Sequence, residues 1–241
     1  MAETRIEIKN LTKKFGKFTA LDGMNLRTDN GEVLAFLGPN GAGKTTAIRC
    51  MLGILKATEG QVSLFGKDAW EHSVELHKRI SFVPGDVNLW SNLTGGEVID
   101  LFLSMRGTKY DKGKRELYLQ KFELDPSKKC RTYSKGNRQK VALVAAFASD
   151  CDLFILDEPT SGLDPLMEKV FNDCITEQKK EGKSVLLSSH ILSEVEKLAD
   201  KISIIKSGKI VENGTMAEIA AKIGNQKFED YFLSKYENIG K

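Results

Sequence analysis

The glycine-rich segment 38–46, which reads G-P-N-G-A-G-K-T-T, constrains the fold of this chain more than any other stretch. It fits the pattern G-x-x-x-x-G-K-[ST]. The apolar run Val33–Leu37 precedes it, and a helical pattern from Lys44 to Leu55 follows it. A strand, a glycine-rich turn and a helix in this order direct backbone N–H groups toward one point, at a helix N-terminus whose dipole favours anions. The sequence therefore predicts a phosphate-binding loop.

Two side chains of this loop carry the predicted chemistry. The ammonium group of Lys44 would reach the β- and γ-phosphates of a nucleotide, and the hydroxyl of Thr45 would hold Mg²⁺. A glycine turn followed by a lysine can also arise by chance, but the flanking strand and helix patterns argue against that interpretation. The predicted phosphate-binding residues are Gly38, Pro39, Asn40, Gly41, Ala42, Gly43, Lys44, Thr45 and Thr46.

A second predicted site element is the apolar run Leu153–Leu156, which ends in the two acids Asp157 and Glu158. A buried strand that delivers a carboxylate to the edge of the sheet can orient Mg²⁺, and we assign this role to Asp157. Glu158 lies one residue further on, where it can polarise an attacking water as a general base. An acidic turn after a strand is the simpler alternative for a single Asp. It does not explain two acids followed by P-T-S-G-L-D.

The order of patterns predicts an α/β fold in a single domain, 1–241, because 241 residues lie near the upper limit for one core. Strands and helices alternate in 1–85 and 150–220, which indicates a nucleotide-binding core with a mixed, mostly parallel sheet and an N-terminal antiparallel part. Residues 86–149 hold three helix patterns without a strand, so we expect an inserted helical lobe. A short helical tail, 221–241, completes the chain.

Composition excludes several other classes of protein. The net charge is only +3 and the basic residues are scattered, so nucleic acid is not an expected partner. No apolar run approaches the ~18 residues that span a bilayer. The segment Met1–Asn10 lacks the apolar region of a signal peptide, so we expect the chain in the cytosol. The four cysteines contain no C-x-x-C pair, which favours buried thiols over a metal site.

Taken together, the motifs resemble those of an ABC-type ATPase, the nucleotide-binding subunit of an ATP-binding cassette transporter. The resemblance rests on the phosphate-binding loop, L-F-I-L-D-E-P, S-G-L-D (Ser161–Asp164) and S-S-H (Ser188–His190), and it covers about Arg5 to Ile219. It implies a P-loop NTPase core and a Mg²⁺-dependent ATPase. It also implies a head-to-tail pair of cassettes, formed with a second copy or a paralogue, that encloses two ATP molecules.

The resemblance also assigns roles to single residues. His190 matches the switch histidine, which contacts the γ-phosphate and Glu158, and Asp164 would contact the phosphate-binding loop of the partner. Phe15 matches the aromatic residue that stacks on adenine. A core position for Phe15, or the same role for Phe18, is the alternative. An integral membrane permease would hold the subunit at the inner face of the cell membrane.

One departure from the family lies in its signature L-S-G-G-Q, which here reads Tyr133-Ser134-Lys135-Gly136-Asn137. Ser134 and Gly136 are retained and could still contact a γ-phosphate across the dimer. Lys135 adds a positive charge but restricts the backbone, and Asn137 is shorter than Gln. Such variants are similar to exporter-type subunits with separate permeases. An ordinary helix capped by Ser134 is the alternative.

A second departure concerns Gly85, which stands where the family has a Gln that meets Mg²⁺ and the attacking water. Either Asp86 or a water beside Gly85 replaces that contact, or Thr45 and Asp157 suffice. The family also has a permease-docking groove between lobe and core, which the segment Asp86–Glu97 would border here. Its apolar Leu89, Trp90 and Leu93 could form a docking patch, or Trp90 could simply pack into the lobe.

Three other functions fit these motifs less well. Soluble cassette proteins that act on ribosomes usually carry two cassettes, whereas this chain has one phosphate-binding loop. Chromosome-associated relatives place a long coiled coil between the two nucleotide motifs. A nucleotide sensor without ATPase activity stays possible because of Gly85, Lys135 and Asn137. The cargo, the direction of transport, the choice between homodimer and heterodimer and the effect of these variants on hydrolysis stay open.

Overall fold

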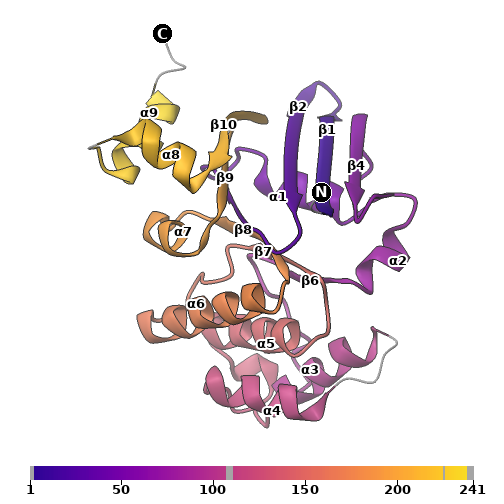
Figure 1. The fold of residues 1–241 in the computed structure, drawn as a ribbon. Coiled ribbons are helices and arrows are strands. Elements are labelled where there is room, and N and C mark those ends of the chain that lie inside the picture. Colours follow the sequence, from indigo (N-terminus) through magenta and orange to yellow (C-terminus); the bar gives the residue numbers. More distant parts are fainter. Residues whose placement is uncertain (1–2, 107–110, 225, 238–241) are drawn as a thin grey trace.

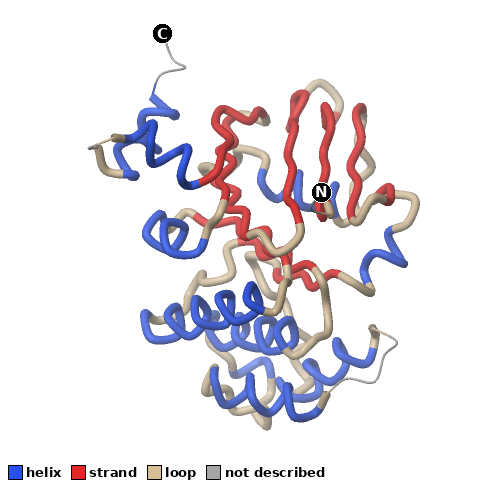
Figure 2. Tube along the Cα trace, viewed as in Figure 1, coloured by secondary structure: helices blue, strands red, loops and turns tan. Residues whose placement is uncertain are grey.

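The computed structural model describes residues 3–106, 111–224 and 226–237. Within this part of the chain, two sheets lie side by side, and helices cover the larger one and extend below it (Figures 1 and 2). The observed α/β architecture agrees with the predicted fold class. Residue 225 and residues 238–241 of the predicted tail lie outside the described ranges.

The smaller sheet contains β1 (Thr4–Phe15), β2 (Phe18–Asp29), β4 (Glu59–Leu64) and β5 (Lys67–Asp68), in the order β2-β1-β4-β5, with antiparallel pairing throughout. The apolar pattern of the sequence predicts strands only over 5–11 and 20–26, so β1 and β2 are longer than expected. Several register shifts interrupt their pairing, so the alternation of apolar and polar residues is lost toward the hairpin turn. The pattern that predicts a strand therefore ends before the strand does.

The larger sheet has the strand order β10-β9-β3-β8-β7-β6, in which only β10 runs antiparallel to its neighbour. All residues of β3 and β7 are buried, which explains why these strands read as uninterrupted apolar runs. The parallel strands end at one edge, where the predicted phosphate-binding and acidic residues follow. The strands are β3 (Val33–Leu37), β6 (Ile80–Val83), β7 (Leu153–Asp157), β8 (Ser184–Ser189), β9 (Lys201–Lys206) and β10 (Lys209–Thr215).

Helix α1 ends at Met51, four residues before the predicted end. Gly53 has φ +63°, and a Cβ on it would lie 2.3 Å from the carbonyl oxygen of Ala69. This left-handed residue and the close backbone approach turn the chain away from the helix axis. The helices that accompany the sheets are α1 (Lys44–Met51), α2 (Ser73–His77), α6 (Pro165–Lys180), α7 (Leu192–Leu198), α8 (Met216–Ile223) and α9 (Phe228–Glu237).

The segment after β6 forms the helices at the bottom of Figure 1: α3 (Gly95–Ser104), α4 (Lys112–Lys121) and α5 (Lys135–Phe147). The pattern T-G-G-E at 94–97 predicts a capping box, which Thr94 and Glu97 make at the start of α3, and Ser134 caps α5 as expected. The ring of Phe147 packs on aromatic rings of the helices and of the sheet layer, and one apolar cluster includes both parts. The helices are thus fixed to the sheet by a shared core.

All four cysteines are buried and free. Burial raises the pKa of the Cys151 and Cys174 thiols to about 12, so they stay protonated. Within the described ranges, no helix combines the length and the apolar character needed to cross a membrane.

Candidate nucleotide-binding site

The loop between β3 and α1 curls around the side chain of Lys44. Its ammonium group is buried and donates hydrogen bonds to the carbonyl oxygens of Gly38 (2.5 Å) and Pro39 (3.4 Å). Glycine is required at both ends of the loop: a Cβ on Gly38 would lie 2.6 Å from the Ile205 carbonyl oxygen, and Gly43 has φ +113°. The strand buries one end of the loop and the helix begins at the other, so the loop conformation is closely fixed.

The N-terminus of α1 is open to an anion. Its N-cap residue is Gly43, no side chain caps it, and its first turn contains no acidic residue. The first N–H groups of a helix need acceptors from outside the helix, and the dipole favours a negative one. Together with the cationic Lys44, these groups fit the phosphates of a nucleotide.

The first of the two acids, Asp157, meets the phosphate-binding loop directly. The hydroxyl of Thr45 donates a hydrogen bond to Asp157 Oδ2 at 2.9 Å, and Asp157 is buried at the end of β7. A hydroxyl and a carboxylate are the oxygen ligands that Mg²⁺ prefers. The pair predicted to hold Mg²⁺ therefore fits that ion by its position and its chemistry.

Glu158 connects Lys44 with His190. One carboxylate oxygen of Glu158 lies 3.7 Å from Lys44 Nζ, and the other lies 3.7 Å from His190 Nδ1. Glu158 has φ +48°, and its N–H donates to the Ser188 carbonyl oxygen at 2.9 Å. A left-handed backbone in a non-glycine residue costs about 1–3 kcal/mol and is common at functional sites. The sequence predicted these three residues as neighbours but gave no sign of the backbone strain.

A cavity of about 350 Å³ lies beside Thr45, Asp157 and Glu158. Asp86 and Gly85 line it as well, so the structure brings Asp86 to the expected place, although its carboxylate accepts only a long hydrogen bond of 3.5 Å from Asn88. The full lining is Thr45, Arg49, Ile54, Phe82, Pro84, Gly85, Asp86, Asp157 and Glu158.

Of the residues that line this cavity, Gly85 was singled out from the sequence and Arg49 was not. A Cβ on Gly85 would lie 3.1 Å from the Asp157 carbonyl oxygen, so the chain passes close to the acidic strand end. The prediction did not include Arg49, which places a cationic side chain at the cavity. Its i, i+4 spacing from Thr45 on one helix would have indicated it.

Residues 134–137 do not line this cavity. Lys135 Nζ donates to the Ser161 hydroxyl at 2.7 Å, and a Cβ on Gly136 would lie 2.4 Å from the Gly162 carbonyl oxygen. Ser134 accepts a hydrogen bond from the Asn137 N–H at 3.2 Å, as the N-cap of α5. The signature-like segment thus packs against the loop that follows Glu158 in the same chain.

The other predicted residues lie at the margins of the site. Asp164 is the N-cap of α6, and its Oδ1 accepts hydrogen bonds from the N–H groups of Leu166 and Met167, both at 3.0 Å. Phe15 is 48% exposed and Phe18 65%, and they pair across the hairpin turn. The alternative of a core position for Phe15 is therefore wrong.

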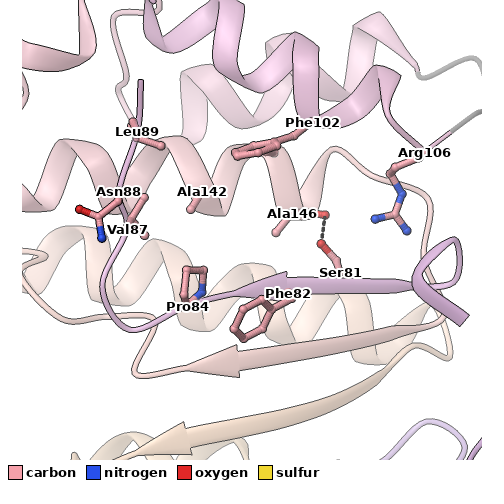
Figure 3. A pocket seen from close by; sticks show the side chains of 11 residues that line it. Ser81, Phe82, Pro84, Val87, Asn88, Leu89, Phe102, Arg106, Ala142 and Ala146 are labelled. Atoms are coloured by element: carbon pink, nitrogen blue, oxygen red, sulfur yellow. Dashed lines mark hydrogen bonds between the residues drawn. The ribbon is translucent and has the colours of Figure 1, made fainter. Parts of the chain in front are cut away.

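A second cavity of about 350 Å³, with a mostly apolar lining, lies between β6 and the helices α3 and α5 (Figure 3). Ser81 on β6 donates to the Ala146 carbonyl oxygen on α5 at its floor. Phe82 and Pro84 line both this cavity and the one beside Asp157. Trp90 packs against Phe102, 5.9 Å between ring centroids, yet stays 50% exposed. Trp90 therefore packs partly against the helical segment, as one alternative expects, and leaves part of its ring exposed, as a docking patch would.

Comparison with known sequences gives a consistent set of relatives. A family model described as "ABC transporter" matches residues 21–161. The chain is 33% identical over 231 residues to the bacitracin transport ATP-binding protein BcrA of Enterococcus faecalis, which covers 95% of this chain and 74% of that protein. It is also 33% identical over 233 residues to the daunorubicin resistance ATP-binding protein DrrA3 of Streptomyces coeruleorubidus, with 95% and 74% covered.

Solved structures are similar over nearly the whole chain. An ATP-binding subunit of an ABC transporter superposes with a TM-score of 0.89 at 29% identity, which covers 97% of this chain and 100% of the other. A dimeric ATP-binding cassette in a post-hydrolysis state, bound to ADP and Pi, superposes with a TM-score of 0.80 at 26% identity. The alignment with this dimer covers 88% of this chain and 98% of the other.

Proposed function

The chain belongs to the ABC transporter family as an ATP-binding, ATP-hydrolysing subunit, and we propose that it pairs with a second cassette and drives a separate membrane permease in export. The observation that carries this proposal is the placement of Glu158 between Lys44 and His190, beside the Thr45–Asp157 pair. A phosphate-binding loop alone would account for nucleotide binding. The positioned carboxylate and imidazole add the groups that hydrolysis requires.

The proposed chemistry follows from the charges of these side chains. Lys44 and the N–H groups at the start of α1 would hold the β- and γ-phosphates and offset their charge. The carboxylate of Glu158 would accept a proton from the attacking water, and His190 would contact the γ-phosphate. Mg²⁺, held by Thr45 and Asp157, would supply further neutralisation of phosphate charge. Asp86 is the additional residue we assign to the Mg²⁺ side of the cavity.

We propose that the second cassette completes the site. Residues 134–137 lie outside the cavity of their own chain, which is what a contribution to the partner's nucleotide would require. ATP would then stabilise the closed pair, because Lys44 of one subunit and the signature-like segment of the other share one γ-phosphate. Hydrolysis removes that shared contact. ATP therefore binds the closed pair more tightly than the separate subunits, and this difference in affinity shifts the population toward the closed pair. The dimeric relative bound to ADP and Pi supports the pairing of two cassettes.

The apolar cavity of Figure 3 is the proposed docking site for a cytoplasmic helix of the permease. Residues 86–149 would act as the helical subdomain that forms one wall of this site. The half-exposed Trp90 at its side would add apolar contact area. Docking there would hold the subunit at the inner face of the cell membrane. Relatives named for bacitracin transport and daunorubicin resistance favour export of a cargo that the permease selects.

The experiment that tests this function measures ATP hydrolysis by the purified chain, alone and with membranes that contain a multi-span protein encoded beside it. We expect Mg²⁺-dependent hydrolysis that the permease membranes stimulate. A rate of ATP hydrolysis that those membranes do not change would contradict coupling to a permease. Tight ATP binding without hydrolysis under both conditions would favour the nucleotide-sensor alternative.

A further inference from the structure

Glu194 is a buried carboxylate outside the site described so far. It lies on α7, four residues after His190, and is 5% exposed. Burying an ionisable group is costly unless polar partners surround it, and an apolar residue at this position would avoid that cost. The partners of Glu194 therefore indicate why an acid stands here.

Glu194 contacts residues from two loops of the nucleotide site. The Ser189 hydroxyl donates to Glu194 Oε2 at 2.8 Å, and Ser189 directly precedes His190. The side chain of Thr160 also interacts with this carboxyl group and lowers its pKa, and Thr160 is buried and lies two residues after Glu158. One carboxylate thus joins the loop that carries His190 to the loop that carries Glu158.

A backbone hydrogen bond also joins the two loops. The Glu158 N–H donates to the Ser188 carbonyl oxygen at 2.9 Å, at the end of the β7–β8 pairing. Beyond that bond, the His190 ring is largely exposed and lies 3.7 Å from Glu158, too far for a hydrogen bond to fix it. The Ile191 N–H donates to the Ser189 hydroxyl at 3.0 Å, so the contact at Ser189 sets the backbone on both sides of His190.

We propose that Glu194 is a positioning residue for ATP hydrolysis: by contacting both Ser189 and Thr160, it fixes His190 relative to Glu158. This inference rests on the proposed function of the same site. Small displacements of catalytic groups lower the rate of the chemical step far more than they weaken binding of the substrate. Loss of Glu194 should therefore lower kcat for ATP and leave KM nearly unchanged.

The test compares kcat and KM for ATP in the purified full-length chain and its variants. We expect Glu194→Ala to lower kcat by about ten- to a hundredfold, with KM within about threefold of the original value. Glu194→Gln keeps the size of the side chain and one accepting oxygen, which can still accept the hydrogen bond from Ser189, so this variant should retain most of kcat. Glu196→Ala is the matched control, because Glu196 lies on the same helix with an exposed side chain. Thermal unfolding confirms that each variant is folded.

A mutant cycle separates positioning from a merely structural role. Thr160→Val should lower kcat in the original chain but cause no further loss in Glu194→Ala, because the contact it removes is already absent. If Glu194→Ala does not fold, the cycle uses Thr160→Val and Ser189→Ala, whose effects on kcat should be non-additive. Full kcat in Glu194→Ala, a loss confined to KM, or additive effects in the cycle would overturn the inference.

The outcomes also distinguish this inference from the proposed function. An original chain that never hydrolyses ATP contradicts the function and removes the basis of the inference. An active original chain together with an equally active Glu194→Ala contradicts the role of Glu194 alone.

Discussion

At the scale of single residues, Lys44 is held in position by the phosphate-binding loop to which it belongs. Its ammonium group is enclosed by the carbonyl oxygens of Gly38 and Pro39 before any phosphate arrives. A phosphate would therefore meet a cation that is already oriented and largely shielded from water. Sequence spacing alone predicted this residue, because the pattern fixes both the lysine and the turn around it.

We expect Lys44→Ala to weaken ATP binding by about 10- to 100-fold, the loss of a charge-assisted hydrogen bond of about 1.5–3 kcal/mol. Equilibrium titration with a fluorescent ATP analogue measures the change. Lys78→Ala removes an exposed lysine and serves as the control. Equal affinities of the original chain and Lys44→Ala would show that the loop does not bind phosphate in this way.

Asp86→Ala tests whether Asp86 takes the place of the side chain that Gly85 lacks. We expect the variant to need about tenfold more Mg²⁺ for half-maximal ATP hydrolysis, the usual cost of losing a group close to a bound metal. A Mg²⁺ titration of the ATPase rate measures this. Unchanged activity and Mg²⁺ dependence would rule out a role for Asp86 and leave Thr45 and Asp157 as sufficient.

Glu194 makes the stability of the fold depend on pH. Burial raises the pKa of its carboxyl group from 4.5 to about 7, the Ser189 and Thr160 hydroxyls oppose this, and Glu168 on α6 adds to it. The folded chain therefore holds this proton more tightly than the unfolded chain does. The resulting stabilisation is complete below pH 4.5 and is lost as the pH rises to about 7.

Relative to Glu194→Gln, which cannot titrate, the free energy of unfolding of the original chain should fall by up to about 3 kcal/mol across this pH range. Urea unfolding of both proteins at pH 4.5 and above pH 7 measures the difference. The exposed Glu196→Gln variant should follow the original chain. A difference between the original chain and Glu194→Gln that stays constant with pH would show that Glu194 keeps an ordinary pKa.

At the scale of elements, the side-chain caps of two helices could be predicted from the sequence, whereas the end of α1 could not. The starts at α3 and α5 depend on the side chains of Thr94 and Ser134, whose caps are local and visible in the sequence. The end of α1 depends on the contact of Gly53 with Ala69, which only the folded chain reveals. The hairpin β1–β2 likewise extends beyond its apolar pattern, because backbone pairing continues through the register shifts.

Ser134→Ala and Thr94→Ala form a matched pair that separates capping from a role in the dimer. Each variant removes an N-cap and should lower the free energy of unfolding by about 1 kcal/mol. Only Ser134→Ala should also weaken ATP-dependent pairing of two chains, because we assign Ser134 a contact with the partner's γ-phosphate. Chemical denaturation and light scattering with ATP measure the two effects. Equal pairing in both variants would leave Ser134 as a helix cap alone.

At the scale of the whole molecule, the parallel sheet explains why residues far apart in the sequence form one site. Residues from four segments, near 40, 86, 157 and 190, meet because the strands that precede them end at one edge. This convergence was predictable from strand–helix alternation. The contact of Lys135 with Ser161 and the link through Glu194 were not, because they join side chains whose spacing follows no local pattern.

The central claim is that one chain holds half of a hydrolytic site and that ATP brings two halves together. Glu158→Gln removes the proposed base and leaves Lys44, Thr45 and Asp157 in place, so ATP should bind and persist. Light scattering of this variant with and without Mg²⁺ and ATP tests the claim most directly. We predict a stable dimer with ATP, a monomer without it, and no detectable hydrolysis. A Glu158→Gln protein that stays monomeric with ATP and hydrolyses it at the original rate would contradict the account.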